Sequence, residues 1–449
     1  MNSVRITKRS LVVGSLLLLL TAGSLSGCTS RSPEAASTPP LSPSQPAASA
    51  SSAVPSEKPS VLPASSPSAL STATPSAVEP ATPSTPADEI AERVSRLTTE
   101  EKIGQLVIIG MDGTSMDETT RSMIVKRHVG GIIFFKPNLH DTKQMLALSN
   151  ELKAANRENP IPLWLSLDQE GGRVTRLPEE FVKFPTNLAI GKANSASFSR
   201  QIGNLIGEQL SGFGYNLDFA PVMDVNSNPD NPVIGDRSFG SSPALVSKLG
   251  TATMKGIAEK KVVPVIKHFP GHGDTSVDSH IGLPVVNYGR DRLDKVELVP
   301  FKAAIEQGAD AVMVAHILLP KLDGKYPASF SKEVIGGLLR KELGFQGVVF
   351  TDDMTMGAVA ENYDLSTAAV DAILAGGDIV LVCHDAAKEK LVLDALVQAV
   401  KDGRISPERL DESVERILRL KLKFGLTDDA ASGPDVAALN KKARSLLNQ

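Results

Sequence analysis

The chain contains very little cysteine, with two residues among 449. Two cysteines in unlike surroundings cannot build a disulfide framework or a cysteine-based zinc site. A basic excess is also missing, because 47 Lys and Arg residues stand against 51 Asp and Glu residues, for a net charge of −4. Nucleic acid is therefore not an expected partner. With 41% hydrophobic residues, however, the chain can bury a sizeable core.

Solenoid repeats and phosphate-binding loops are missing as well. No unit recurs at a fixed period. The pair Gly171 and Gly172 belongs neither to a Gly-x-Gly-x-x-Gly motif nor to a Walker motif. The length would suit about three average domains, yet an α/β barrel uses about 200 to 400 residues as one domain. Length alone does not divide the chain.

The first 28 residues have the pattern of an export signal. Basic residues precede a short apolar run from Leu11 to Leu20, and small residues follow it. Residues 25–28 read Leu-Ser-Gly-Cys, which resembles the lipobox of bacterial lipoproteins. That resemblance implies cleavage before Cys28, lipidation of its thiol, and an extracytoplasmic protein held on the membrane surface without spanning it. An ordinary cleaved signal with a chance cysteine is the alternative.

Residues 29–87 have the composition of a linker. They hold 13 of the chain's 30 prolines, are otherwise mostly Ser, Ala and Thr, and contain no aromatic residue and no glycine. Such a stretch cannot bury enough apolar surface to offset its ordering entropy, and its prolines favour extended conformations. We expect a disordered stalk, followed by one folded domain over residues 88–449. A capping box formed by Thr98 and Glu101 predicts an early helix.

Eight short apolar runs alternate with helical stretches in the folded part. The predicted strands are Leu106 to Ile109, Gly131 to Phe135, Leu163 to Leu167, Leu217 to Pro221, Val262 to Ile266, Ala311 to Ala315, Val348 to Phe350 and Ile379 to Val382. Strands that alternate with helices favour a parallel sheet, and eight of them favour a closed (β/α)8 barrel of the TIM type. The predicted fold class is therefore α/β, with a single catalytic barrel.

Ionisable residues follow the apolar cores of six of these runs. They are Asp168, Asp224, Lys267 with His268, His316, Asp352 and His384. Any one of them could be a solvated loop residue. Their shared position is the carboxyl end of a strand, where barrel enzymes assemble their active sites. We therefore expect these side chains to surround one site.

The densest chemical pattern lies at residues 267–280, which hold three of the seven histidines. Asp278 and His280 are two residues apart, so in an extended loop they project to the same side, and the carboxylate can fix the imidazole tautomer. This arrangement is typical of a proton-transfer pair. A metal site built from His268, His272, Asp278 and His280, or a structural hydrogen-bond network, would use the same residues. The pattern alone leaves these three interpretations open.

Two further segments carry charged residues at strand ends. The pair Asp352 and Asp353 could supply a nucleophile or a metal ligand, and spacing does not rank the two. Asp168 could accept hydrogen bonds from sugar hydroxyls, with Arg176 reaching back as a donor. Arg237 stands alone between two glycines in a third segment.

Taken together, these segments resemble family 3 glycoside hydrolases, specifically the bacterial β-N-acetylglucosaminidase branch that acts on peptidoglycan fragments. The motifs occur in the family's order over residues 98–425 and are Asp-Gln-Glu-Gly-Gly-Arg-Val at 168–174, Ala-Pro-Val-Met-Asp-Val at 220–225, Gly-Asp-Arg-Ser-Phe-Gly at 235–240, Lys-His-Phe-Pro-Gly-His-Gly-Asp at 267–274, Asp-Ser-His at 278–280 and Thr-Asp-Asp-Met at 351–354. The resemblance implies that Asp352 is the nucleophile, that His280 is the acid/base and that Asp278 is its partner. The sugar-binding residues that it implies are Asp168, Arg176, Arg237, Lys267 and His268.

The resemblance implies a retaining exo-enzyme that removes terminal β-linked N-acetylglucosamine through a covalent glycosyl-enzyme, with water or phosphate as acceptor. It implies no metal, no cofactor and a monomer whose partner is carbohydrate. Many family members carry a second domain after the barrel, and the single-domain type is the better match here. The expected lipid anchor at Cys28 favours wall-derived muropeptides outside the membrane. No role is assigned to His272, Asp274 or His316.

Two other classes of protein fit parts of the pattern. A barrel metal hydrolase could use the same His and Asp cluster and would lose activity on chelation. A lipoprotein that binds glycans without cutting them would need a damaged catalytic set, whereas Asp352, His280 and Asp278 are all present.

Overall fold

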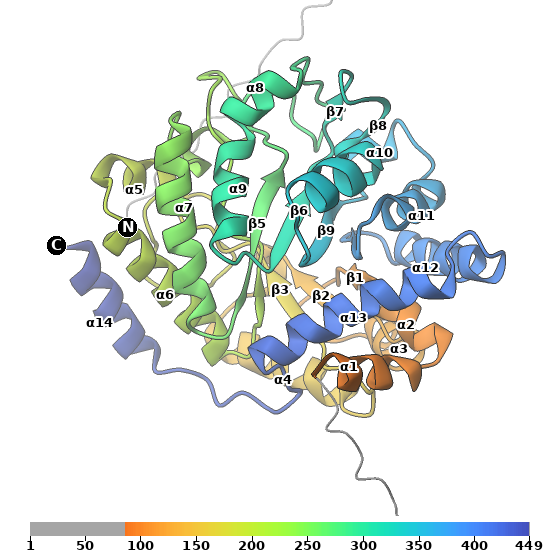
Figure 1. Cartoon of the computed structure of the whole chain (residues 1–449). Helices are drawn as coiled ribbons and strands as arrows, with labels where there is room; N and C mark the ends of the chain where they lie inside the picture. Colours follow the sequence, from red (N-terminus) through yellow and green to blue (C-terminus); the bar gives the residue numbers. More distant parts are fainter. Residues whose placement is uncertain (1–85, 449) are drawn as a thin grey trace, which may run out of the picture. The chain divides into compact units, whose positions relative to one another are not determined.

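The structure is a computed structural model that describes residues 86–448 (Figure 1). The predicted signal peptide with Cys28, and the predicted linker as far as residue 85, lie outside the described residues. Among residues 86–448, none of the helices combines the length and the apolar character that crossing a bilayer requires. The predicted capping box is confirmed, because Oγ1 of Thr98 accepts the backbone N–H of Glu101 at 3.2 Å and the Glu101 carboxylate accepts that of Thr98 at 2.7 Å.

Eight parallel strands close into a barrel, as the sequence predicts. The strands are β1 (Val107–Ile109), β2 (Gly131–Phe134), β3 (Trp164–Leu167), β4 (Leu217–Asp218), β5 (Val263–Phe269), β6 (Ala311–Val314), β9 (Val348–Asp353) and β10 (Ile379–Val382). Their order around the barrel is β1-β10-β9-β6-β5-β4-β3-β2. The register of Ile108 with Leu381 joins the first strand to the last. The barrel prediction is confirmed.

Three strands differ in length by two or more residues from the apolar runs that predicted them. β5 continues to Phe269 and β9 to Asp353, so Lys267, His268 and Asp352 lie within strands instead of directly after them. Pairing with the neighbouring strand continues past the apolar run, and tertiary context overrides local propensity there. β4 is shorter than predicted and ends at Asp218.

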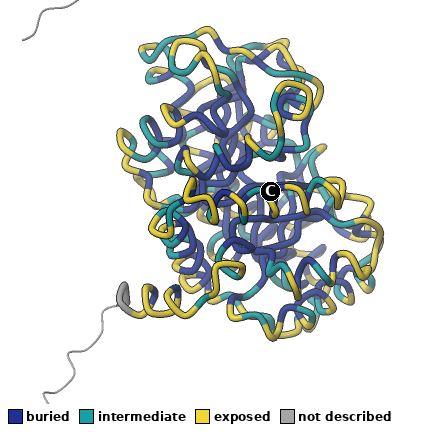
Figure 2. Tube along the Cα trace, turned by 90° about the vertical axis from the view of Figure 1, so that its right-hand side faces the viewer, coloured by how far each residue is buried: buried dark blue, intermediate teal, exposed yellow. Residues whose placement is uncertain are grey.

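Helices surround the barrel, and buried segments lie inside with exposed segments outside (Figure 2). The α-helices are α1 (Pro86–Ser95), α2 (Thr99–Gln105), α3 (Glu118–Arg127), α4 (Thr142–Asn156), α5 (Asn187–Ala193), α6 (Ala196–Gly212), α7 (Pro243–Ala258), α8 (Arg290–Lys295), α9 (Leu298–Glu306), α10 (Gly357–Ala360), α11 (Leu365–Ala375), α12 (Ala386–Lys401), α13 (Pro407–Phe424) and α14 (Val436–Leu447). Short 3-10 helices are η1 (Lys136–Asn138), η2 (Gly235–Arg237) and η3 (Ala328–Phe330), and η4 (Glu333–Glu342) is a π-helix. Aromatic rings fill part of the interior, with Phe219 and Phe350 edge to face at 5.7 Å.

A small antiparallel pair that the sequence analysis did not predict follows β6. It consists of β7 (Leu318–Leu319) and β8 (Asp323–Pro327). Both strands lie at the top of Figure 1, so the carboxyl ends of the barrel strands face upward in that view. This upper face is where a barrel's active site is expected.

Candidate active site

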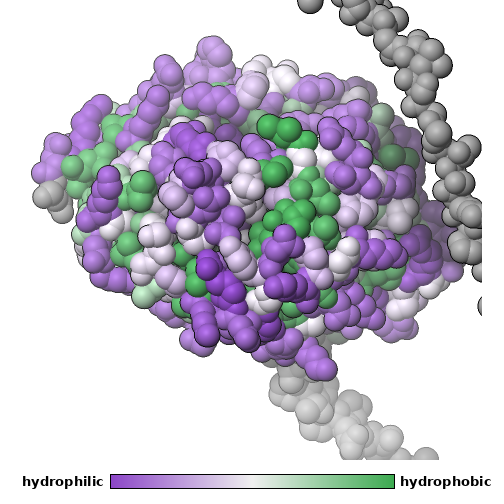
Figure 3. All heavy atoms as spheres, turned by 90° about the horizontal axis from the view of Figure 1, so that it is seen from above, coloured by the Kyte–Doolittle hydropathy of each residue, from purple (hydrophilic) through white to green (hydrophobic). Residues whose placement is uncertain are grey.

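A cavity of about 350 Å³ opens at the carboxyl ends of the barrel strands. Seven predicted site residues line it, namely Asp168, Arg176, Arg237, Lys267, His268, His280 and Asp352. Asp278, the remaining residue of the predicted catalytic set, lies outside this lining and reaches the site through His280. His384 lines the cavity as expected, whereas Asp224 and His316, the other strand-end residues expected there, do not. Figure 3 looks down on this face and shows apolar residues (green) grouped among polar ones (purple). A cavity of this size, with a few convergent polar groups, suits a small-molecule site.

Four ion pairs link the charged groups of the cavity floor. Nζ of Lys267 lies 2.6 Å from Oδ1 of Asp168 and 2.7 Å from Oε1 of Glu170. Arg237 donates to both carboxylate oxygens of Glu170, at 2.7 and 2.9 Å, and Arg176 donates to Oδ2 of Asp168 at 3.2 Å. The side chains of Lys267 and Glu170 are only 2% and 1% exposed. The floor is thus a closed network of charge-assisted hydrogen bonds.

This network keeps its members charged despite their burial. Burial alone would raise the pKa of Asp168, but the charges of Lys267 and Arg176 outweigh it and lower that pKa. Burial would likewise raise the pKa of Glu170, and Arg237 and Lys267 hold it well below its ordinary value. The pKa of Lys267 is raised, because the two carboxylates outweigh its burial. An ordered set of charged donors and acceptors therefore faces the cavity, as sugar hydroxyls require.

His268 is oriented by a buried carboxylate. Its Nδ1 lies 2.6 Å from Oδ2 of Asp224, and its Nε2 lies 3.3 Å from Nη2 of Arg237. A guanidinium can only donate, so Nε2 accepts and Nδ1 carries the proton that Asp224 accepts. Burial would raise the pKa of Asp224, but the neighbouring His268 outweighs it, and the pKa is lowered.

Asp352 lies near the carboxyl end of β9 and faces the cavity. Its Oδ1 accepts the backbone N–H of Asp353 at 2.9 Å. Burial would raise its pKa, but His316, His268 and this backbone hydrogen bond outweigh burial, so the pKa of Asp352 lies below its ordinary value. An ionised, partly exposed carboxylate at this position can act as a nucleophile.

His280 and Asp278 lie on the loop that follows β5. Nδ1 of His280 is 2.8 Å from Oδ1 of Asp278, and the imidazole is 66% exposed. The backbone of this loop is joined to the segment after β9, since Ser279 O accepts the N–H of Ala358 at 3.0 Å and His280 O accepts that of Gly357 at 3.3 Å. The loop thereby holds the pair over the strand that carries the candidate nucleophile.

Comparison with known proteins identifies the family of this chain. Residues 98–420 match the glycosyl hydrolase family 3 N terminal domain. The chain belongs to glycosyl hydrolase family 3. The sequence prediction of a glycoside hydrolase of the β-N-acetylhexosaminidase type is thereby confirmed.

Individual relatives support the same family. Over 335 residues, 69% of this chain, the protein is 36% identical to Beta-hexosaminidase A of Pseudoalteromonas piscicida, and it spans 56% of that relative's length. Over 72% of this chain it is 36% identical to Beta-hexosaminidase LpqI of Mycobacterium tuberculosis, of which it covers 83%. A family 3 β-N-acetylglucosaminidase structure from Paenibacillus sp. is 43% identical with a TM-score of 0.74, over 78% of this chain and 68% of that one.

Two residues that hold the site of this family 3 hydrolase together had no role in the sequence prediction. Glu170 bridges Lys267 and Arg237, and Asp224 orients His268. Glu170 lies inside the motif at 168–174, and Asp224 was recognised only as a strand-end acid. Lys267 and Arg237 are buried cations, and buried cations require a counter-charge. This requirement is the signal that could have identified Glu170.

His272 and Asp274, which had no assigned role, lie on the loop that follows β5, and His272 also lines the cavity of this family 3 site. His272 is buried, with Nδ1 2.6 Å from Oγ1 of Thr275 and Nε2 3.3 Å from Oγ of Ser279, and burial with the nearby His268 lowers its pKa to about 4. Asp274 accepts the hydroxyl of Ser227 at 2.9 Å.

His316 is fully buried and contacts the end of β9, the strand that carries Asp352. Its Nε2 lies 2.9 Å from the carbonyl of Asp353, and its Nδ1 lies 2.6 Å from Oγ of Ser329. The imidazole therefore donates from Nε2 and accepts at Nδ1. Burial lowers the pKa of His316, which favours this neutral form.

His268, His272 and His280, three of the four candidate metal ligands, line the cavity of the family 3 site. Within residues 86–448, no group of three or more His, Cys, Asp or Glu side chains is arranged to hold a metal ion. His268 pairs with Asp224, whereas His280 pairs with Asp278. The second acid, Asp353, accepts the N–H and hydroxyl of Thr355 at 2.9 and 2.8 Å.

Proposed function

We propose that this hydrolase is a retaining exo-β-N-acetylglucosaminidase that releases terminal β-linked N-acetylglucosamine from peptidoglycan-derived fragments. The observation that carries the proposal is the ionised carboxylate of Asp352 in a cavity overlaid by the His280–Asp278 pair. The usual retaining glycosidase uses two carboxylates, and here a carboxylate-oriented imidazole takes the place of the second.

In the first step, a carboxylate oxygen of Asp352 attacks the anomeric carbon and forms a covalent glycosyl-enzyme. The bond to the leaving oxygen breaks, and that oxygen keeps the electron pair and takes a proton from Nε2 of His280. Asp278 accepts a hydrogen bond from Nδ1, which stabilises the imidazolium before transfer and fixes the ring's orientation.

In the second step, a water molecule attacks the anomeric carbon and gives a proton to Nε2 of the neutral His280. The bond to Asp352 breaks, and the carboxylate is restored. Two displacements at one carbon retain the β configuration. Phosphate as the acceptor would need no base, so the choice between the two acceptors depends on which one reaches the anomeric carbon.

The charged floor supports exo-cleavage and a sugar substrate. Asp168 and Lys267 present an acceptor and a donor to ring hydroxyls, with Arg176 beside them. Because the Lys267–Glu170 pair is almost fully buried, the floor leaves no path for a glycan to continue beyond the first sugar. The proposal therefore limits the substrate to a chain end.

The proposed natural substrate and the proposed cellular location are inferred from the N-terminal sequence. Lipidation at Cys28 would anchor the enzyme outside the cell membrane, and residues 29–87 would hold the barrel away from the lipid surface. Wall fragments are the β-N-acetylglucosaminides expected there. Replacing Cys28 with Ala should move the protein from the membrane fraction of the producing bacterium to the soluble fraction, and an unchanged membrane fraction would contradict the anchor.

The activity is tested by incubating the purified protein with a chromogenic N-acetyl-β-glucosaminide, with and without EDTA. We expect release that EDTA does not change, β-anomeric product, and a loss of about 10³-fold or more in Asp352→Asn. Asp385→Asn is the matched control. Asp385 follows β10 at the same face of the barrel and is the N-cap residue of α12, a role that Asn can also fill. Inactivation by EDTA, or full activity in Asp352→Asn, would overturn the proposal.

A further inference from the structure

The cavity changes from buried to exposed between its floor and its rim. Lys267 and Glu170 at the floor are 2% and 1% exposed, whereas His280 is 66% exposed and His384 is 61% exposed. An acid/base must contact the oxygen that joins the terminal sugar to the next one. Side chains at the exposed rim, where His280 lies, are therefore expected beside the second sugar. Side chains at the buried floor are expected beside the terminal sugar.

Two aromatic side chains pack against each other at this rim. Phe135 directly follows β2 and His384 follows β10, the two strands on either side of β1. Their ring centroids are 4.7 Å apart with an angle of 35° between the planes, and both residues line the cavity. We call these two residues the rim plate. The guanidinium of Arg176 lies 5.7 Å from the Phe135 ring and also binds Asp168, so the plate adjoins the floor.

The rim plate is fixed from both of its strands. Oδ1 of Asn138, a buried side chain, accepts the backbone N–H of Phe135 at 2.8 Å. Nε2 of His384 lies 3.8 Å from Oδ2 of Asp353, whose Oδ1 accepts the N–H of Cys383 at 3.0 Å. Phe135 is partly buried and packs against the hydrophobic core, whereas His384 is exposed, so the pair offers a ligand an aromatic surface that is anchored from below.

We propose that the rim plate of Phe135 and His384 is the subsite for the second sugar, whose pyranose ring lies against it while the terminal sugar occupies the charged floor. This inference rests on the proposed function. One face of a pyranose ring presents C–H groups, and an aromatic face is the surface that such groups contact best. The plate therefore contributes to binding only when the leaving group is itself a sugar ring.

The test compares two substrates that share the terminal sugar. One is N-acetylglucosamine β-1,4-linked to N-acetylmuramic acid, and the other is N-acetyl-β-glucosaminyl fluoride, whose leaving group has no ring. In Phe135→Leu and His384→Ala, the ratio of kcat/KM for the disaccharide to kcat/KM for the fluoride should fall about tenfold, the size of a lost aromatic contact. Phe135→Tyr keeps the ring face and should keep the ratio.

His140→Ala is the matched control, because His140 follows the same strand but is 79% exposed and lies outside the cavity lining. If the wild type cleaves both substrates and the ratio of kcat/KM values is unchanged in Phe135→Leu and His384→Ala, the rim-plate proposal is wrong and the proposed function stands. A wild type that cleaves neither substrate would overturn the proposed function and the rim plate together. A variant that folds poorly lowers both kcat/KM values equally, and the ratio still decides the question.

Discussion

Oδ1 of Asp278 accepts two hydrogen bonds from one residue, from Nδ1 of His280 at 2.8 Å and from its backbone N–H at 2.9 Å. Burial would raise the pKa of Asp278, but these two hydrogen bonds outweigh burial and lower it. The carboxylate thus stays ionised near neutral pH and fixes the imidazole with Nε2 directed away from it. A short loop segment thereby supplies the oriented imidazole that the proposed mechanism requires.

His280→Ala should slow cleavage of the disaccharide about 10²- to 10⁴-fold, the usual contribution of a general acid/base. An activated leaving group such as dinitrophenolate departs without protonation, so the first step should survive and the second should become limiting. Rapid-mixing kinetics should then show a burst of dinitrophenolate equal to the enzyme concentration. Full activity of His280→Ala on the disaccharide would show that the acid/base assignment is wrong, and His140→Ala serves as the control.

Glu170→Gln should disturb the cavity floor without changing its shape. The substitution removes the charge between Lys267 and Arg237, two cations that are buried with it. Loss of one partner from such a network costs about 3–5 kcal/mol in the free energy of unfolding. Misplaced floor donors should also lower kcat/KM about 10²-fold.

The control for Glu170→Gln is Asp236→Asn. Asp236 pairs with Arg173 at 2.8 Å, but the two side chains are 40% and 50% exposed, and an exposed pair contributes about 1 kcal/mol or less. For both variants, urea unfolding measures the free energy of unfolding and steady-state kinetics measures kcat/KM. Equal effects in both would show that the floor network has no special role.

The barrel was predictable because strands buried on both faces read as continuous apolar runs. Residues such as Asp168 and Asp352 could be assigned to one face because each comes at the carboxyl end of such a run. Both signals are local in the sequence.

The links between site residues were not predictable in the same way. Glu170 and Arg237 are 67 positions apart and meet only because the barrel closes. The pairing of Phe135 with His384 likewise depends on two strands that flank β1. Apolar periodicity reports which face of an element is buried, but it carries no information about which charged side chain meets which.

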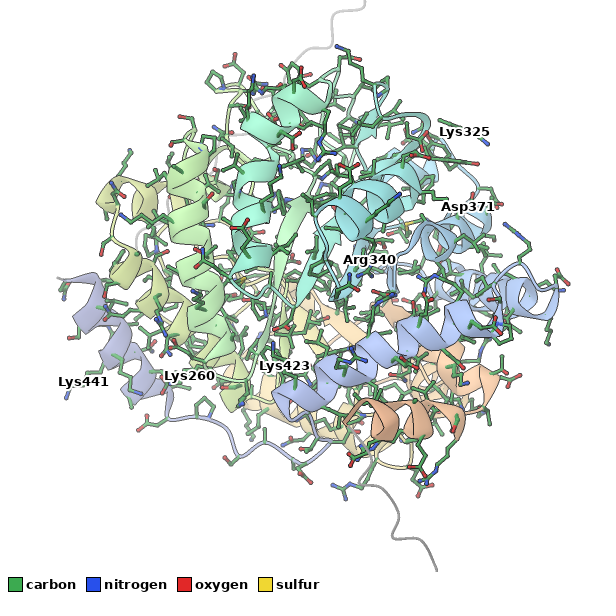
Figure 4. The ribbon with its side chains drawn as sticks, in the orientation of Figure 1. Lys260, Lys325, Arg340, Asp371, Lys423 and Lys441 are labelled. Carbon is green, nitrogen blue, oxygen red and sulfur yellow. The ribbon has the colours of Figure 1, made fainter. Side chains whose placement is uncertain are left out.

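Asp378→Asn should destabilise the barrel away from the active site. Asp378 is fully buried, accepts the backbone N–H of Val349 on β9 at 2.9 Å, and pairs with Arg340 and with Nη1 of Arg416 at 3.1 Å. Removing its charge takes the ion-pair partner from Arg340 and leaves Arg409 and Arg416 only the exposed carboxylate of Glu412. The loss should cost about 3–5 kcal/mol in the free energy of unfolding. Arg340 is labelled in Figure 4.

Asp310→Asn is the matched control for Asp378→Asn. Asp310 binds Lys423 at 2.6 and 2.8 Å, and the lysine, also labelled in Figure 4, is 56% exposed. The control should lose about 1 kcal/mol or less. Urea denaturation distinguishes the two, and a loss in Asp378→Asn as small as in the control would contradict the importance of the buried cluster.

His272 should make the stability of the barrel depend on pH. Its pKa of about 4 in the folded protein lies below the ordinary value of 6.5, so between these values the unfolded chain binds the proton more readily. Its contribution to stability is complete above pH 6.5 and is lost as the pH falls toward 4, by about 3 kcal/mol in total. In His272→Asn, the difference between the free energies of unfolding at pH 6.5 and pH 4 should shrink by that amount. Exposed His140, replaced in the same way, should leave the difference unchanged, and parallel pH curves for wild type and His272→Asn would show that His272 is not the responsible group.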